Sequence, residues 1–219
     1  EIISGLVGSE MCIRDRPGLT TGIGNSTNVR VQILDGNLIV NPVEIPRAGV
    51  NTLTSTFTVQ DHGFETGYKI LAYGSLGTAS SLPSGIEQKT YFVLKIDNDN
   101  FQLSNSRVQL FKDPPEVVSV ASTGFQGQTF NPINPPLKVT KNNNIVFNLN
   151  DPSLSGSKLK VFYDNNFFNE FVGSGTTENV EVTEFGTVGI GTTLTSTTPT
   201  KTINYNKSFS GELYYGIER

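Results

Sequence analysis

The sequence predicts an all-β protein built of two or three small modules. Short apolar runs with alternating polar neighbours recur along its 219 residues, and 22 Gly and 11 Pro among many Ser, Thr and Asn favour turns between strands. No apolar pattern of the form i, i+3, i+4, i+7 persists over the roughly 11–18 residues that indicate a helix. The length suits one large β domain or two smaller ones.

Residues 6–16 resemble the translation of a DNA-sequencing adapter. In one reading frame, the transposase adapter used for tagmentation libraries encodes LVGSEMCIRD followed by Arg or Ser, and the chain reads LVGSEMCIRDR. A signal peptide is the alternative, but it needs a positive start and an apolar stretch of about 7–15 residues. Here Glu1 is acidic, and Gly and Ser interrupt the apolar residues. We therefore set residues 1–16 aside as an adapter-derived artefact and expect a fragment that enters its own frame near Pro17.

A linker followed by a β-hairpin is predicted for residues 17–47. Apolar and polar residues alternate over 29–33, Asp35 and Gly36 follow, and a second apolar run occupies 38–40. An Asp-Gly pair between two apolar runs is typical of a hairpin turn, because both residues tolerate positive φ.

A small β module is predicted for residues 48–110, with strands at 56–59, 69–73, 90–96 and 101–103. Residues 111–136 hold Pro114, Pro115, Pro132, Pro135 and Pro136. Because proline lacks the N–H that a central strand needs, we expect a connection there, with one short strand at 117–120 at most.

Residues 137–219 are predicted to form a β-sandwich or barrel, because short strand candidates recur at roughly even spacing. The chain stops just after the last candidate without a closing loop, which favours truncation of this module. The candidates lie at 137–140, 145–149, 159–163, 180–182, 192–194, 201–205 and 212–217.

The composition argues against several classes of function. A formal charge of −4 offers no basic field for nucleic acid. No apolar run approaches the roughly 20 residues of a membrane helix. One His, one Cys and one Met, the last two within the excluded residues, leave little for a soft-metal or nucleophilic site. We therefore expect no enzyme, no catalytic residue, no bound metal and no cofactor.

His62 is the only imidazole and the one candidate for a hydrolase centre. A catalytic base needs a nucleophile or a second group within hydrogen-bond reach, and the sequence identifies none. The run Asp61-His62-Gly63 also fits a turn in which Gly63 supplies a positive φ. We favour the turn.

The run Asp97-Asn98-Asp99-Asn100 resembles the start of a calcium loop. An EF-hand counted from Asp97 needs Gly at its sixth position and Glu at its twelfth, and the chain has Gln102 and Val108 there. A polar turn is favoured for this run and for residues 164–166.

Glycine-rich residues 186–191 have the wrong glycine order for a dinucleotide loop and are interpreted as turns. Aromatic residues gather in the third module, where core packing is favoured over a sugar- or partner-binding platform. These aromatics are Phe162, Tyr163, Phe167, Phe168, Phe171, Tyr214 and Tyr215.

Two stretches resemble modules of phage tail and fibre proteins. Residues 60–70 (QDHGFETGYKI), 90–96 (TYFVLKI) and 100–103 (NFQL) are similar to a small β module of these proteins, with Tyr68 in place of the usual Asp. Residues 144–157 (NIVFNLNDPSLSGS) and 212–217 (ELYYGI) resemble cupredoxin-like modules of the same proteins.

The second resemblance implies a metal-free module. Metal-competent relatives carry His after the Ser-Leu-x-Gly turn and a Cys/His cluster after the Leu-Tyr-Tyr strand, whereas this chain has Ser157 and then Gly216-Ile217-Glu218. A blue-copper site needs two His and one Cys.

Together, the modules resemble part of a large virion structural protein of marine cyanobacterial myoviruses. The resemblance implies a tail, baseplate or fibre location, protein partners within the virion and possible homo-oligomers. It also agrees with a gene fragment recovered by environmental sequencing. The alternative is an adhesin module that binds a receptor or a host-surface glycan through the aromatics.

Overall fold

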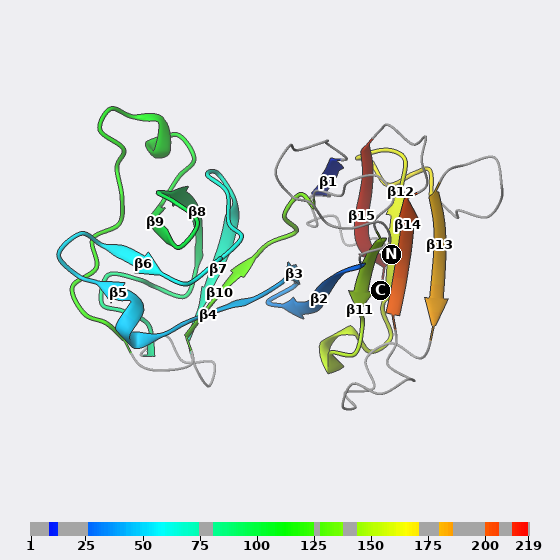
Figure 1. The fold of residues 1–219 in the computed structure, drawn as a ribbon, viewed down its shortest axis with the longest axis horizontal. Coiled ribbons are helices and arrows are strands. Elements are labelled where there is room, and N and C mark those ends of the chain that lie inside the picture. The colour runs from blue at the N-terminus through cyan, green and yellow to red at the C-terminus, as the bar shows by residue number, and fades with distance from the viewer. Residues whose placement is uncertain are drawn as a thin grey trace. The chain divides into compact units, whose positions relative to one another are not determined.

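The computed structural model describes residues 9–12, 26–74, 81–124, 128–137, 144–170, 180–185, 200–205 and 212–218. Over these ranges the chain forms strands and short 3-10 turns but no α-helix, so the predicted all-β class is confirmed (Figure 1). The chain divides into two compact units. One is the 41–133 unit, and the other, which we call the discontinuous unit, combines residues 1–40 with 134–219.

A seven-stranded antiparallel sheet forms the 41–133 unit, in the order β4-β10-β7-β8-β9-β6-β5. The two edge strands, β4 and β5, are consecutive in the chain and are joined through the 3-10 turn η1 (Arg47–Gly49). A second 3-10 turn, η4 (Gln109–Phe111), lies between β9 and β10. The strands are β4 (Val43–Ile45), β5 (Val50–Asn51), β6 (Thr56–Thr58), β7 (Lys69–Tyr73), β8 (Thr90–Lys95), β9 (Asn100–Ser104) and β10 (Gln128–Pro132).

Phenylalanine rings fill the core of the 41–133 unit. Phe101 stacks on Phe57 at a centroid distance of 5.5 Å, and Phe130 meets Phe57 edge-on at 4.8 Å. Alternate residues of β8 and β9 point inward, so that Tyr91 and Leu103 are also fully buried. This alternation is the pattern that predicted the strands.

Strand β10 corrects the prediction for residues 111–136. It lies between β4 and β7, in a stretch interpreted as a connection without central strands. The prediction was wrong because Pro132, the last residue of the strand, lies past the residues that pair with β4, so its missing N–H removes no hydrogen bond to that neighbour. Residues 117–120 form no strand, although the Val118 N–H donates to the Leu103 carbonyl at 2.7 Å.

The discontinuous unit contains two sheets, with strand orders β1-β15-β12 and β13-β14-β11-β2-β3. All neighbouring strands are antiparallel except β2 and β11, which pair in parallel. The strands are β1 (Ser9–Cys12), β2 (Ser26–Leu34), β3 (Asn37–Val40), β11 (Asn144–Asn148), β12 (Lys158–Phe162), β13 (Val180–Phe185), β14 (Thr200–Tyr205) and β15 (Glu212–Glu218).

Both sheets of the discontinuous unit contribute to one core, which makes this unit sandwich-like as predicted. Val29 and Phe147 come from the five-stranded sheet, and Val161 and Tyr215 come from the three-stranded sheet. The Tyr215 hydroxyl donates to the Pro135 carbonyl at 2.6 Å, which satisfies its buried polar atom. Leu137 packs against this core without joining a strand, and residues 138–140 and 192–194 lie outside the described residues.

The hairpin β2–β3 belongs to this sandwich and not to a linker region. Five residues of β2 pair with β11, and the inward residues of both hairpin strands enter the same core as β15. The unit therefore begins before the predicted boundary at residue 137. Strand β1, within the excluded residues 1–16, pairs with β15.

Candidate functional site

His62 is a packed core residue in the structure. Its ring lies 5.1 Å from the ring of Phe64 and 4.9 Å from that of Phe101. The Phe64 N–H donates to His62 Nδ1 at 2.9 Å, and Nε2 is buried without a hydrogen bond. Burial lowers the pKa of His62, while the backbone of Asn100 and Asp97 opposes this shift. The lowered pKa favours the neutral ring at pH 7, and the ring packs against Phe64 in a tilted arrangement and against Phe101 edge-on.

The polar turn at residues 97–100 binds its own backbone. Asp97 Oδ1 accepts from the N–H groups of Asp99 and Asn100, each at 2.8 Å. Asp99 Oδ1 accepts from the Asp61 N–H at 2.9 Å, which ties this turn to the loop that carries His62. Hydrogen bonding by the Asn100 side chain is the main cause that lowers the pKa of Asp97. The carboxylates here act as turn caps.

Asp164 has the same role in the turn at residues 164–169. Its Oδ1 accepts from the N–H groups of Asn166 and Phe168, and its Oδ2 accepts from the Asn169 N–H at 2.9 Å. Desolvation tends to raise the pKa of Asp164, but these hydrogen bonds together lower it. The described part of the chain contains no group of three or more His, Cys, Asp or Glu that could hold a metal ion. Residues 186–191 lie outside the described ranges.

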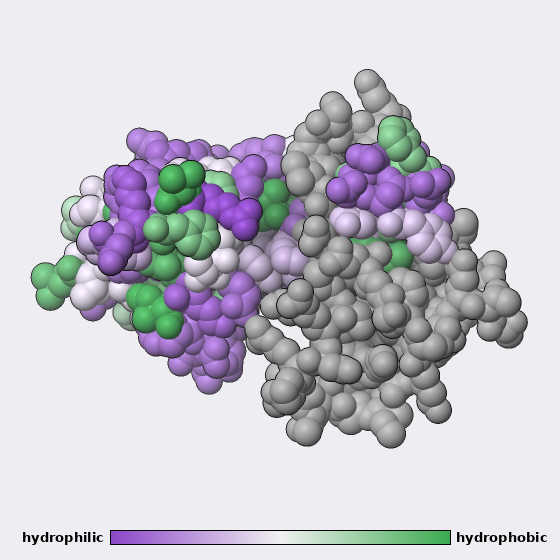
Figure 2. All heavy atoms as spheres, turned by 90° about the horizontal axis from the view of Figure 1, so that it is seen from above, coloured by the Kyte–Doolittle hydropathy of each residue, from purple (hydrophilic) through white to green (hydrophobic). Residues whose placement is uncertain are grey.

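The candidate functional site is the loop of residues 105–116 between β9 and β10, which we call the apolar loop (green in Figure 1). Val108 is 76% exposed and Phe111 is 72% exposed, whereas their neighbour Leu110 is buried and anchors η4. Figure 2 shows one face of the molecule, on which apolar residues lie among polar ones. Exposed apolar side chains that lie together on one surface are typical of protein-binding sites.

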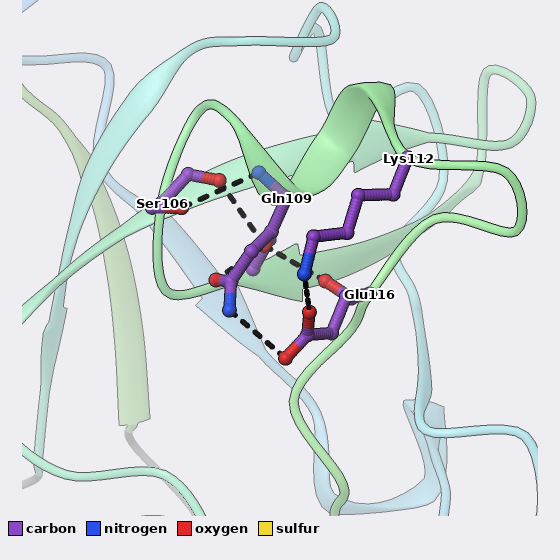
Figure 3. Close-up of polar contacts among 5 residues, drawn as sticks. Ser106, Gln109, Lys112 and Glu116 are labelled. Atoms are coloured by element: carbon purple, nitrogen blue, oxygen red, sulfur yellow. Dashed lines mark hydrogen bonds and ion pairs between the residues drawn. The ribbon is translucent and has the colours of Figure 1, made fainter.

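A polar network fixes the apolar loop (Figure 3). Ser104 Oγ donates to the Glu116 carbonyl at 2.8 Å, and the Gln109 N–H donates to Ser106 Oγ at 3.3 Å. Gln109 Nε2 donates to Glu116 Oε1 at 2.9 Å, and Lys112 forms an ion pair with the same carboxylate. This ion pair lowers the pKa of Glu116. The network joins both ends of the loop, so binding there would lose little conformational entropy.

Sequence reasoning missed the apolar loop because its residues lie in the proline-rich stretch that was interpreted as a connection. The available signal is the spacing of Val108, Leu110 and Phe111, which fits a helical turn with one buried and two exposed residues. Spacing alone does not tell which of the three is buried.

A second exposed surface is the turn of residues 163–169, beyond β12. Phe168 is 85% exposed, and Tyr163 is also exposed. Phe167 meets Phe162 edge-on at 5.0 Å and covers Gly216 on β15, where an added Cβ would lie 3.3 Å from the Phe167 ring. Lys160 secures the turn through ion pairs with Glu170 at 2.9 Å and Glu218 at 3.1 Å.

The predicted aromatic group is thus divided between core and surface. Phe162 and Tyr215 are buried, as favoured for the group, whereas Tyr163 and Phe168 face solvent. Phe167 and Tyr214 are half-buried, and Phe171 lies outside the described residues.

Comparisons with protein-family models, with curated proteins and with solved structures found no match for this chain. Within the described ranges, no helix combines the length and the apolar character that crossing a membrane requires.

Proposed function

We propose that this chain is a non-enzymatic structural protein of a phage virion, associated with the tail, baseplate or fibre, and that it acts by packing against neighbouring chains. The observation that carries the proposal is the apolar loop, which holds Val108 and Phe111 exposed on a polar framework. The resemblance of residues 60–103 and 144–217 to tail and fibre modules supplies the virion context. The cupredoxin-like relationship of the sandwich belongs to the same proposal.

A structural role also fits the hydrogen bonds that the polar side chains make to the backbone. His62 Nδ1 accepts from the backbone, and the carboxylates of Asp97 and Asp164 cap their own turns. Side chains engaged in this way support the fold, whereas catalysis needs several polar groups that converge on a reacting atom.

The test is binding to tail, baseplate and fibre proteins of a marine cyanobacterial myovirus. In the double variant Val108→Ser, Phe111→Ser, we expect affinity to fall at least about tenfold, because exposed anchor side chains dominate interface energies. The matched control is Leu53→Ser, which removes an apolar side chain that is 96% exposed elsewhere in the same unit. Thermal unfolding of both variants should match that of the parent. Equal binding by both variants, or no binding by the parent, would contradict the proposal.

A glycan-binding adhesin is the second candidate, favoured by Tyr163 and Phe168 beside the Asn and Asp residues of the 163–169 turn. Exposed rings next to polar amides can stack on a sugar and bond its hydroxyls. A glycan array probes this function directly, with Phe168→Ala as the test and Phe111→Ala as the matched exposed-ring control. An empty array, or equal loss in both variants, would exclude it.

A further inference from the structure

Two buried side chains hold an otherwise exposed loop to the core of the 41–133 unit. The loop consists of residues 60–65, which we call the His62 loop, and it lies outside the strands. His62 is 6% exposed and Phe64 is 1% exposed, whereas residues 60, 61 and 63 face solvent. Both buried rings contact Phe101, at centroid distances of 4.9 Å and 5.0 Å. The position of the loop therefore depends on these two rings remaining in the core.

Backbone hydrogen bonds fix the chain on either side of the His62 loop. Before the loop, the Val59 N–H donates to the Asp99 carbonyl at 2.8 Å, and after it the Gly67 N–H donates to the Val93 carbonyl at 2.8 Å. None of the strand pairs in the described part of this unit includes a residue of the loop. The loop can therefore open between two fixed ends without breaking a strand pair.

The hydrogen bond at Nδ1 makes the buried ring of His62 sensitive to acid. Nδ1 accepts from the Phe64 N–H at 2.9 Å, so the single N–H of the neutral ring is at Nε2. A second proton must bind to Nδ1, where it would face the Phe64 N–H, and two donors cannot hydrogen-bond each other. The imidazolium would also be a charge packed against aromatic rings, and burying a charge costs free energy. Protonation therefore favours a state in which the ring has left the core.

The charged groups near His62 do not reverse this preference. They are Lys95 on β8, Asp97 and Asp99 in the adjoining turn, and Asp61 and Glu65 in the loop itself. Burial is the main cause that lowers the pKa of His62, and the charge of Lys95 lowers it further. The charge of Asp97 and the backbone of Asp97 and Asn100 act in the opposite direction, but the pKa stays below its ordinary value.

We propose that the His62 loop is a pH-sensitive switch: in acid, protonation of the His62 ring breaks its hydrogen bond with Phe64 and releases the loop from the core. Histidine is the side chain whose charge normally changes between about pH 5 and 8. Opening one loop between fixed ends requires less free energy than unfolding the sheet. Acid would thus expose the Phe64 ring on a surface where residues 60, 61 and 66 are polar. The inference concerns the 41–133 unit alone and does not rest on the virion role.

The test is amide hydrogen exchange of the full chain by NMR, from about pH 7.5 to 5.0, corrected for the intrinsic pH dependence of exchange. In the open loop, His62 takes up a proton at its ordinary pKa of 6.5. The opening equilibrium at the Phe64 amide should therefore rise at least about fivefold, and at most about thirtyfold for a single proton. This opening should not respond to low concentrations of urea, because a local opening exposes little surface. The Val93 amide, bonded to the Tyr68 carbonyl at 2.9 Å, should be better protected and should respond to urea.

Two variants separate the buried ring from other titrating groups. His62→Phe keeps an aromatic ring but removes the ionisable group, so the pH dependence at the Phe64 amide should vanish. The matched control adds Gln60→His to His62→Phe, which places one imidazole at an exposed position of the same loop. An exposed ring binds its proton equally well in the closed and open loop, so this double variant should also show no pH dependence. If His62→Phe does not fold, His62→Gln replaces it, because its amide oxygen can accept from the Phe64 N–H.

Four results would overturn the proposal. An opening equilibrium that is constant over this pH range in the parent would show that protonation does not release the loop. The same rise in the variant without His62 would assign the effect to the neighbouring carboxylates. A full rise in the double variant would show that burial of the ring is irrelevant. Equal protection and equal urea dependence at the Phe64 and Val93 amides would make the opening a global unfolding of the unit.

Discussion

Replacing Phe101 by alanine should strongly destabilise the 41–133 unit. Phe101 is fully buried, and its ring lies 4.9 Å from His62, 5.0 Å from Phe64, 5.5 Å from Phe57 and 5.9 Å from Phe130. Truncating a core Phe to Ala costs about 3–5 kcal/mol. Four ring contacts place this site near the upper end, at about 5 kcal/mol.

This magnitude is large compared with the stability of the unit. At about 0.05–0.15 kcal/mol per residue, a unit of about 90 residues has a free energy of unfolding of about 5–14 kcal/mol. Phe101→Ala should therefore remove between a third and all of it. The core around Tyr215 shares no member with the cluster around Phe101 and should keep its protection.

The assay is hydrogen exchange by mass spectrometry, with peptides from β8 and β9 compared with peptides from β11 and β15. Phe111→Ala is the matched control, because the same truncation at a side chain that is 72% exposed should change stability by less than about 0.5 kcal/mol. A loss below about 1 kcal/mol for Phe101→Ala, or equal losses in both variants, would refute the burial argument.

The remaining predictions concern pH and backbone sterics. Burial holds the pKa of His62 below its ordinary 6.5. Between the folded and unfolded pKa values, the unfolded chain therefore binds a proton that the folded chain does not. The free energy of unfolding should be highest above about pH 6.5 and fall as the pH drops towards the folded pKa. Urea midpoints across this range should show the slope, and His62→Gln should abolish it. Gly85→Ala should destabilise the chain by more than about 2 kcal/mol, because φ is +98° and the new Cβ would lie 2.1 Å from the Ser119 carbonyl oxygen. Gly36→Ala, where φ is +73° and nothing lies near the new Cβ, should cost about 1 kcal/mol. Thermal unfolding of both variants measures the two losses, and equal losses would contradict the steric reason.

Local elements could be predicted from the sequence because their signals lie within a few residues. The Asp35-Gly36 turn has positive φ at both residues, 48° and 73°, as an Asp-Gly hairpin requires. Alternation placed β7, β8 and β9 within a residue or two of their observed ends. In each case the pairing partner or the turn follows directly in the chain.

Long-range pairings could not be predicted in the same way. Strand β2 pairs in parallel with β11, more than 100 residues away, and no local pattern records which strand is its neighbour. Strand β10 was missed because proline content was read over the whole stretch, whereas only the position of Pro132 within the strand decides the pairing. Whether Phe111 is exposed depends on a network that closes between Ser104 and Glu116.

Carboxylates of several turns are occupied by hydrogen bonds within the fold. Asp97, Asp151 and Asp164 direct their carboxylates at backbone N–H groups of their own turns. Glu116 is bound by Gln109 and Lys112 and holds a loop in place. Polar groups fixed in this way give rigid turns, because each satisfies a donor that would otherwise be unpaired. The exposed side chains between the hydrogen-bonded residues are then the ones available to a partner. In the apolar loop these side chains are Val108 and Phe111.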